Sequence, residues 1–188
     1  RAAASFVPAF HDAAAGYLAD RVVDGVRDQT LRPNQLLAAS LPYKLIDAER
    51  TRQMLDRIDH GLLTPHGLRT LAPSEPGYRG IYLGDRWARD GAYHQGTAWA
   101  WLIGPYVDAW LYAHAGEPGA ERAALGLLDP LLRQVYDAGV GSLSEIYDGA
   151  APHEPRGCIS QAWSVGEALR ILGRLLPANA PAGRPSGS

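Results

Sequence analysis

The sequence is poor in cysteine and has no excess of either charge. Cys158 is the only cysteine, so no disulfide can form within the chain, which fits a reducing compartment. The 18 basic side chains nearly balance the 20 acidic ones, and the formal net charge is -2. The sequence has no basic stripe of the kind that binds nucleic acid. A nucleic-acid partner is therefore not expected.

Long hydrophobic runs are also missing. The longest apolar stretch, residues 98–113, is interrupted by Gly104, Pro105 and Asp108. It is too short and too broken to span a membrane, and it is expected to form a buried helix. No charged segment followed by an apolar stretch resembles a signal peptide, so a cytoplasmic location without a membrane partner is expected. The chain begins at Arg1 rather than Met, which predicts a processed, trimmed or partial polypeptide.

The usual motifs of phosphate, serine, cysteine and metal chemistry are absent as well. The sequence has no Gly-rich loop of the Walker type and no Gly-x-Ser-x-Gly motif. Cys158 lies at an expected helix start, which can acidify a thiol, but no Cys–His–Asn set can be read. Metal-ligand spacing with acids or cysteine is missing at His66, His94, His114 and His153. No metal and no cofactor are therefore expected.

The composition that remains is that of one globular domain. Of the 188 residues, 46% are hydrophobic and 20% are charged, which suffices for a sizeable core. The Pro-, Ala-, Gly- and Ser-rich segment 177–188 is expected to be a disordered tail. Hydrophobic periodicity predicts an all-α domain with long loops over residues 1–176. The expected helices are 1–16, 34–40, 48–60, 97–116, 120–137 and 159–176, with an extended or hairpin segment over 17–28.

Local signals support several of these boundaries. Pro33 stands where a helix can begin, and Asp47 is a candidate N-cap with Gly61 as the stop. Residues 62–93 and 139–157 show no sustained period and are expected to be long loops, which are often functional. The side chains expected to face inward in the last two helices are Leu125, Leu128, Leu132, Tyr136, Trp163, Leu169, Leu172 and Leu176.

The stretch Gly141–Gly149 places one carboxylate, Glu145, in a loop of small residues between two helical segments. A carboxylate presented in this way, with aromatic side chains and an arginine nearby, suits a general base in sugar hydrolysis. The alternative interpretation is a solvated acid on a surface loop, which is a common feature of proteins.

Two further groups of residues suit carbohydrate binding. Aromatic rings offer apolar faces to the C–H side of sugars, and amide, imidazole and guanidinium groups bind hydroxyls. Packing and helix capping are the competing explanations for both groups. The first group lies before and at the start of the apolar helix and contains Trp87, Arg89, His94, Gln95 and Trp99. The second group, Arg32 and Asn34, lies at the start of the 34–40 helix. Asp148 and Arg156 follow Glu145 in its loop and are added to them. The predicted substrate-binding residues are Arg32, Asn34, Trp87, Arg89, His94, Gln95, Trp99, Asp148 and Arg156.

Four segments together resemble the C-terminal part of glycogen debranching enzymes, the amylo-α-1,6-glucosidase module. They are Leu31–Gln35, Leu62–Leu71, Tyr93–Pro105 and Gly141–Ser164, and they extend in order over nearly the whole chain. The family pattern has Val where Ala98 stands and Pro where Ala100 stands. Both replacements are small and remove no chemical group, although they can alter the shape of a pocket.

The resemblance implies an (α/α)6 toroid similar to that of glucoamylase, of which residues 1–176 are about the C-terminal half. It also implies that Glu145 is the general base in an inverting release of glucose from an α-1,6 branch of a glycogen-type glucan. The general acid is implied to lie outside this chain, towards the N-terminus. Asp90 is the only local candidate for that acid.

Half a toroid leaves apolar helix faces uncovered, so the missing N-terminal half or a second chain is expected as a partner. Three other interpretations remain open. The chain can be a catalytically incomplete module that binds glucan, a related inverting hydrolase for another α-glucosidic linkage, or a helical interaction fragment. The number of Trp, His, Gln and Arg side chains in loops argues against the last, since an interaction helix needs mainly an apolar stripe.

Overall fold

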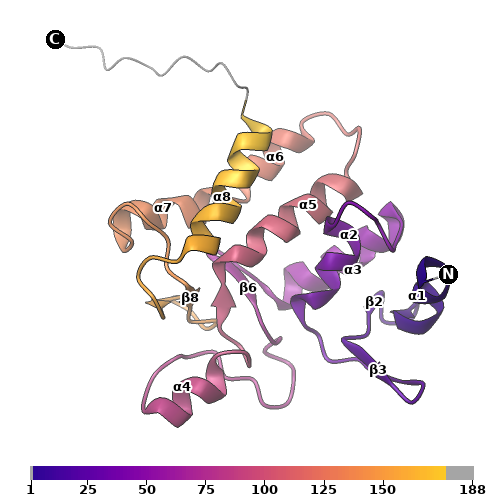
Figure 1. The fold of residues 1–188 in the computed structure, drawn as a ribbon, viewed down its shortest axis with the longest axis horizontal. Coiled ribbons are helices and arrows are strands. Elements are labelled where there is room, and N and C mark those ends of the chain that lie inside the picture. Colours follow the sequence, from indigo (N-terminus) through magenta and orange to yellow (C-terminus); the bar gives the residue numbers. More distant parts are fainter. Residues whose placement is uncertain (1, 177–188) are drawn as a thin grey trace.

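The computed structural model describes residues 2–176, and the tail expected over 177–188 lies outside the described residues (Figure 1). Helix α5 (Ile103–Ala113) forms the centre of the helical part. Helices α2 (Leu37–Ser40) and α3 (Ala48–Gly61) pack on it from one side, and α6 (Ala120–Gly126) and α8 (Ala162–Leu175) contact it from the other. This helical layer confirms the helix-rich part of the sequence prediction.

Helix α3 and its packing were predicted correctly from the sequence. The Asp47 side chain caps the helix by accepting a hydrogen bond of 2.8 Å from the Arg50 backbone N–H. The inner face of α3 presents Met54, Leu55 and Ile58 to the core. The 3₁₀ turn Pro33–Leu36 precedes α2, as expected for a helix that begins at proline.

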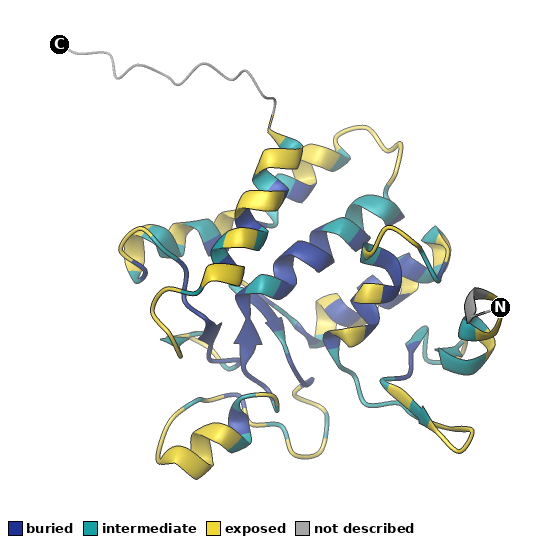
Figure 2. Ribbon diagram, in the orientation of Figure 1, coloured by how far each residue is buried: buried dark blue, intermediate teal, exposed yellow. Residues whose placement is uncertain are grey.

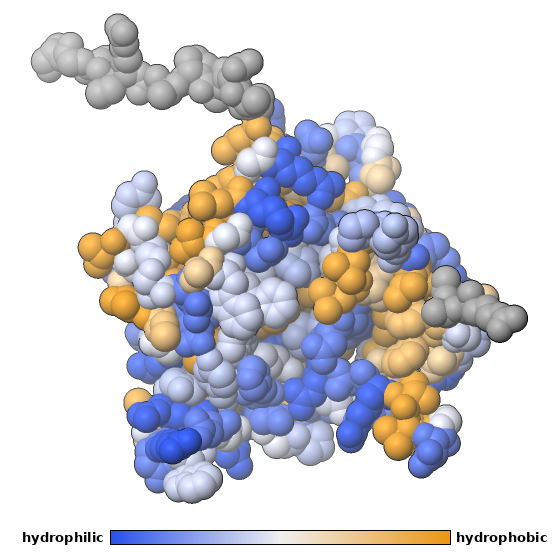
Figure 3. Space-filling model, viewed as in Figure 1, coloured by the Kyte–Doolittle hydropathy of each residue, from blue (hydrophilic) through white to orange (hydrophobic). Residues whose placement is uncertain are grey.

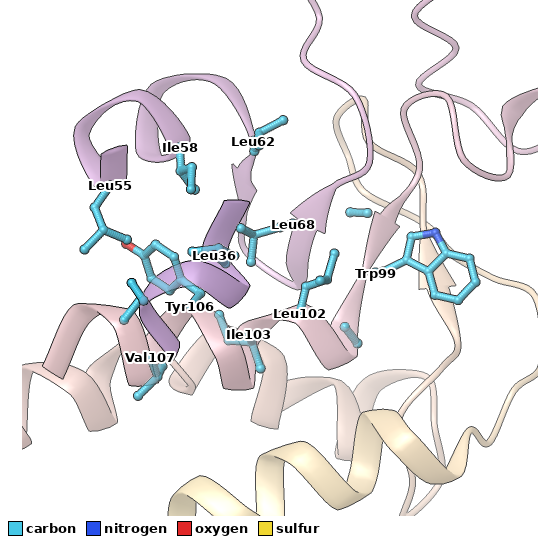
Figure 4. Close-up of a cluster of buried hydrophobic side chains, with 14 of the residues drawn as sticks. Leu36, Leu55, Ile58, Leu62, Leu68, Trp99, Leu102, Ile103, Tyr106 and Val107 are labelled. Atoms are coloured by element: carbon cyan, nitrogen blue, oxygen red, sulfur yellow. The ribbon is translucent and has the colours of Figure 1, made fainter. Parts of the chain in front are cut away.

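The buried core lies between these helices. Seven of the 11 residues of α5 are buried and none is exposed, in agreement with its largely apolar sequence (Figure 2). Figure 4 shows Tyr106 and Val107 of α5 packed towards Leu55 of α3 and Leu36, while Trp99 lies at the far edge of the same cluster. The core therefore extends from the helical layer to the segment that precedes α5.

The all-α prediction is wrong in one respect, because the described residues include a five-stranded antiparallel sheet. Its strands lie in chain order and carry two or three residues each, which is too short for alternation to be recognised in a sequence. The segment 62–93, expected to be a loop, contains two of them, and Trp99 is in a strand rather than at a helix start. The strands are β5 (Leu63–Thr64), β6 (Gly67–Arg69), β7 (Ala98–Trp99), β8 (Ile146–Tyr147) and β9 (Pro155–Arg156).

The N-terminal helix is shorter than expected. Helix α1 (Ala2–Phe10) ends where β1 (His11–Asp12) pairs with β2 (Tyr17–Leu18). A second hairpin, β3 (Arg21–Val23) with β4 (Val26–Asp28), confirms the extended or hairpin segment expected before residue 28.

The helix expected over 120–137 is two helices. Helix α6 ends at Gly126, and α7 (Asp129–Asp137) begins with Pro130 in its first turn, where proline ends one helix and starts another. Leu128 and Leu131 are buried, but Tyr136 is 89% exposed, so its expected inward position is wrong.

The inner face expected for the last helix is right only at Leu172, which is partly buried against the core. Trp163, Leu169 and Leu176 are exposed, and α8 instead buries Ser164, Ala168 and Ile171 against its neighbours. Ser164 and Ala168 are small and let the neighbouring helices approach closely. The sequence pattern predicted large apolar side chains at this interface instead. Figure 3 shows apolar side chains at the surface over α8.

The arrangement does not by itself show a ring of inner and outer helices, so half a toroid remains a prediction. Helix α7 and the short α4 (Arg86–Ala92) lie outside the α5 layer, with α4 at the opposite end of the molecule from α6 (Figure 1). Within residues 2–176, no helix has the length and apolar character needed to cross a membrane.

Candidate active site

Glu145 lies directly before β8, and hydrogen bonds join it to Tyr93 and to Cys158. Its backbone N–H donates to the Cys158 carbonyl at 2.9 Å, which joins it to the segment after β9. Its Oε1 accepts a hydrogen bond from the Tyr93 hydroxyl, and its Oε2 accepts one of 3.0 Å from the Cys158 N–H. The residue is only 9% exposed. Glu145 is therefore not the solvated loop acid of the alternative interpretation.

The environment of Glu145 favours the ionised carboxylate. Burial acts to raise its pKa, but hydrogen bonds from Tyr93, the Cys158 N–H and the Gln161 side chain outweigh burial and hold the pKa below the ordinary 4.5. An ionised carboxylate accepts a proton, as a general base must, and cannot donate one as a general acid does.

Gly157 makes room for this carboxylate. Its φ is +67°, in the left-handed region that favours glycine. A Cβ at this position would overlap the Glu145 Oε2. The turn after β9 therefore requires glycine both for its backbone and for its contact with Glu145.

Beside Glu145 lies an aromatic cluster, which we define as Tyr93, His94, Trp99, Trp101 and Trp163. Ring centroids are 4.8 Å apart for Tyr93 and Trp99, 5.0 Å for His94 and Trp99, and 5.5 Å for Trp99 and Trp163. Trp101 stacks on Trp163, also at 5.5 Å. Trp99 is buried, while His94 and Trp163 are exposed and can offer surface to a ligand. The cluster thus connects the carboxylate to the surface.

The predicted residues near 32 and near 94 are brought together. The Arg32 guanidinium donates to the His94 carbonyl at 3.0 Å, to the Gln95 Oε1 at 2.9 Å and to the Thr70 carbonyl at 2.9 Å. The Asn34 amide donates instead to the Asp20 carboxylate, at 2.8 Å. Arg32, His94, Gln95 and Trp99 therefore form one neighbourhood with Glu145.

Asp148, directly after β8, and Arg156 of β9 bind each other. The carboxylate of Asp148 accepts from Arg156 at 2.8 Å and 3.0 Å, and its second oxygen accepts the Tyr82 backbone N–H at 2.7 Å. The Tyr82 ring packs on Tyr93, with centroids 5.7 Å apart. The pair therefore holds the segment behind Tyr93, and its predicted contact with substrate remains a prediction.

Trp87 and Arg89 are not brought into this neighbourhood. Both are on α4, where Trp87 is 81% exposed. Among residues 2–176, Trp87 makes no ring contact with the aromatic cluster, and Arg89 donates to the Gly84 carbonyl at 3.2 Å. Asp90, the local candidate for an acid, pairs with Arg86 at 3.4 Å on the exposed side of the same helix.

Sequence reasoning missed three contacts of the site. It treated Trp163 as core and did not connect Tyr93 or Gln161 to the carboxylate. The connecting element is the sheet, in which Trp99 of β7 is paired with Ile146 of β8, the residue after Glu145. A pairing between residues 47 positions apart leaves no local signal in the sequence.

None of five cavities in the described part of the chain is lined by Glu145, although Trp101 lines one of about 540 Å³ together with Glu167 and Arg170. Within residues 2–176, no group of three or more His, Cys, Asp or Glu side chains could hold a metal ion.

A buried carboxylate beside aromatic, imidazole and amide groups is compatible with a site that acts on carbohydrate. Comparison with known families identifies the class: the pattern of the amylo-alpha-1,6-glucosidase family matches residues 1–170. The chain therefore belongs to this family of glycosidases.

A curated relative gives the same result. A stretch of 93 residues is 34% identical to the glycogen debranching enzyme of Saccharomyces cerevisiae. The match covers 46% of this chain and 6% of that protein, so the chain corresponds to a small part of its relative.

Proposed function

We propose that this chain is the base-carrying part of a glycoside hydrolase that releases glucose from α-1,6 branch points of glycogen-type glucans. The observation that carries the proposal is the Glu145 carboxylate, ionised and held by Tyr93 beside the aromatic cluster. Membership of the amylo-alpha-1,6-glucosidase family supports the class of reaction. The debranching activity named for the yeast relative supports the substrate.

In the proposed mechanism Glu145 accepts a proton from a water molecule as that water attacks the anomeric carbon, which inverts its configuration. The two carboxylate oxygens have about four acceptor positions, so Tyr93, the Cys158 N–H and the Gln161 side chain still leave one for the water. A second carboxyl, about 6.5–9.5 Å away, must protonate the leaving oxygen. Asp90 is exposed and paired with Arg86, so we assign the acid to a segment outside this chain.

Substrate binding is proposed for the residues that surround the base. Arg32, Gln95 and His94 would bind sugar hydroxyls, and Trp99 would shape the apolar wall. The remaining predicted contacts are more peripheral in the structure. They are Asn34, Asp148, Arg156, Trp87 and Arg89.

We further propose that the chain forms part of an (α/α)6 toroid closed by the missing N-terminal half or by a second chain. The exposed apolar side chains Leu169 of α8 and Leu176 at its end support this proposal because a covering helix would remove them from water. Glu145 lines none of the five cavities, which also supports the proposal. The second part of the toroid would then supply the wall that encloses the substrate.

The test is release of glucose from a glucan with α-1,6-linked branch stubs, by the complete enzyme that carries this module. Replacing the base by E145Q should lower kcat by about 10²- to 10⁴-fold and leave glucan binding intact. The matched control is E154Q, because Glu154 is an exposed acid of the same loop. Turnover at the control level in E145Q would refute the assignment of the base.

A second candidate is a module that binds glucan without hydrolysis. It is favoured by the ion pairs of the other acids singled out from the sequence, since Asp148 is bound by Arg156 and Asp90 by Arg86. Titration of the complete enzyme with a branched maltooligosaccharide, followed by product analysis, separates the two. Binding without hydrolysis in the complete enzyme would favour this second function, and the products would also show which linkage is cleaved.

A further inference from the structure

Tyr93 connects the aromatic cluster to the Glu145 carboxylate and is itself rigidly held. Its backbone carbonyl accepts the Trp99 indole N–H at 3.0 Å and the Thr97 hydroxyl at 2.6 Å. Its ring contacts His94 at 4.7 Å and Trp99 at 4.8 Å between centroids. A ring fixed by neighbours on several sides leaves its hydroxyl little freedom of direction.

The hydroxyl donates to the Glu145 Oε1, while the Cys158 N–H donates to the Oε2 at 3.0 Å. Two donors on different oxygens fix both the position and the rotation of a carboxylate group. Hydrogen bonds to a charged group are stronger than those between neutral groups. The orientation of the carboxylate therefore depends on the Tyr93 hydroxyl together with the Cys158 N–H and the Gln161 side chain.

Tyr93 remains a donor throughout the pH range in which a glycosidase works. Burial, and then the hydrogen bond to the Glu145 carboxylate, raise the pKa of the Tyr93 hydroxyl above its ordinary value of 10.0. It therefore does not compete with Glu145 for the proton of a water molecule.

We propose that Tyr93 is a positioning residue, whose hydroxyl fixes the plane of the Glu145 carboxylate and directs one free acceptor position of that group towards the attacking water. This inference rests on the proposed function, because it takes Glu145 to be the base. It goes beyond that function by assigning to Tyr93 the orientation of the base rather than contact with substrate.

The test is the pair Y93F and Y82F in the complete enzyme. Y93F removes only the donated hydrogen bond, and it should lower kcat about 10- to 100-fold with little change in KM. It should also move the acid limb of the kcat/KM profile to higher pH, because the ionised form of Glu145 loses a donor. Y82F is the matched control, since Tyr82 packs on Tyr93 but donates no hydrogen bond to Glu145, and it should leave both measurements unchanged.

A readout independent of turnover is the titration of Glu145 followed by NMR of ¹³C-labelled glutamate in the same enzyme. Y93F should raise the pKa of Glu145, and a fluorinated tyrosine placed at position 93 should lower it, because its hydroxyl is a stronger donor. The fluorinated residue keeps the aromatic ring and its packing, so it serves even if Y93F folds poorly.

The outcomes distinguish this inference from the proposed function. If E145Q abolishes glucose release while neither change at position 93 moves the titration or the pH profile, the positioning role is overturned. If both changes move the titration as expected but E145Q retains turnover, the contact is real and the assignment of the base fails.

Discussion

Two polar segments of this chain, 141–158 and 85–92, look alike in sequence but differ in the structure. Both contain glycine, charged residues and a predicted substrate-binding residue. In the first, Glu145 is 9% and Asp148 4% exposed, and every carboxylate oxygen of the two accepts a hydrogen bond. In the second, α4 leaves Trp87 81% exposed. Polar residues form a site where tertiary contacts desolvate and orient them, not where they merely accumulate.

The cause of the difference is the sheet. Strand β8 follows Glu145 and is paired on both sides, with β7 and β9, which bring the carboxylate next to Trp99 and to the 157–158 turn. Helix α4 has no such pairing, and its cap, Asp85, bonds only within the helix. Substitutions in the buried segment should therefore have large effects, and those on α4 small ones.

The largest effect among the following predictions is expected from G157A. A Cβ at this position would displace the Glu145 carboxylate, and the φ of +67° is unfavourable for alanine. A displacement of about 1 Å can lower turnover about 100-fold, so kcat for glucose release should fall by that factor. The matched control is G166A on α8, where a Cβ meets no atom within 4 Å and alanine should be neutral or stabilising. A G157A enzyme with the kcat of the control would contradict the tight contact.

The next effect compares one acid from each segment. D148N leaves Arg156 without its nearly buried partner, so the free energy of unfolding of the 188-residue chain should fall by about 2 kcal/mol. D85N on α4 should change it by less than about 0.5 kcal/mol, because asparagine caps a helix as well as aspartate does. Urea denaturation measures both, and equal losses would mean that the two segments do not differ as described.

A smaller effect concerns stability in acid. The pKa of Glu145 is lower in the folded protein than the ordinary 4.5, so the folded state holds its proton less tightly than the unfolded state. Its contribution to stability is complete above about pH 4.5 and is lost as the pH falls through the folded pKa. The loss of stability between neutral pH and about pH 3.5 should therefore be smaller in E145Q than in the wild type. The same loss in both proteins would show that Glu145 is not held as its hydrogen bonds indicate.

How much of this could be predicted from the sequence depends on the range of the contacts involved. The Asp47 cap, the inner face of α3 and the hairpin before residue 28 follow from neighbours a few residues apart, and they were predicted correctly. Glu145 could be singled out because its loop carries few other side chains. The bond from Tyr93 and the exposure of Trp163 could not be predicted, since both depend on pairing and packing between distant segments.

The smallest effect is expected at Trp87, and it tests whether α4 lies outside the site. Because Trp87 is 81% exposed and lies outside the aromatic cluster, W87A should change KM for a branched glucan about twofold at most and leave kcat unchanged. W163A removes ring contacts to Trp99 and Trp101, and it should raise KM about tenfold. Initial rates over a range of glucan concentrations give both constants. If W87A raised KM as much as W163A does, α4 would contact the substrate as closely as the cluster does. The boundary of the site would then have to include α4, brought to the ligand by a rearrangement or by a neighbouring segment.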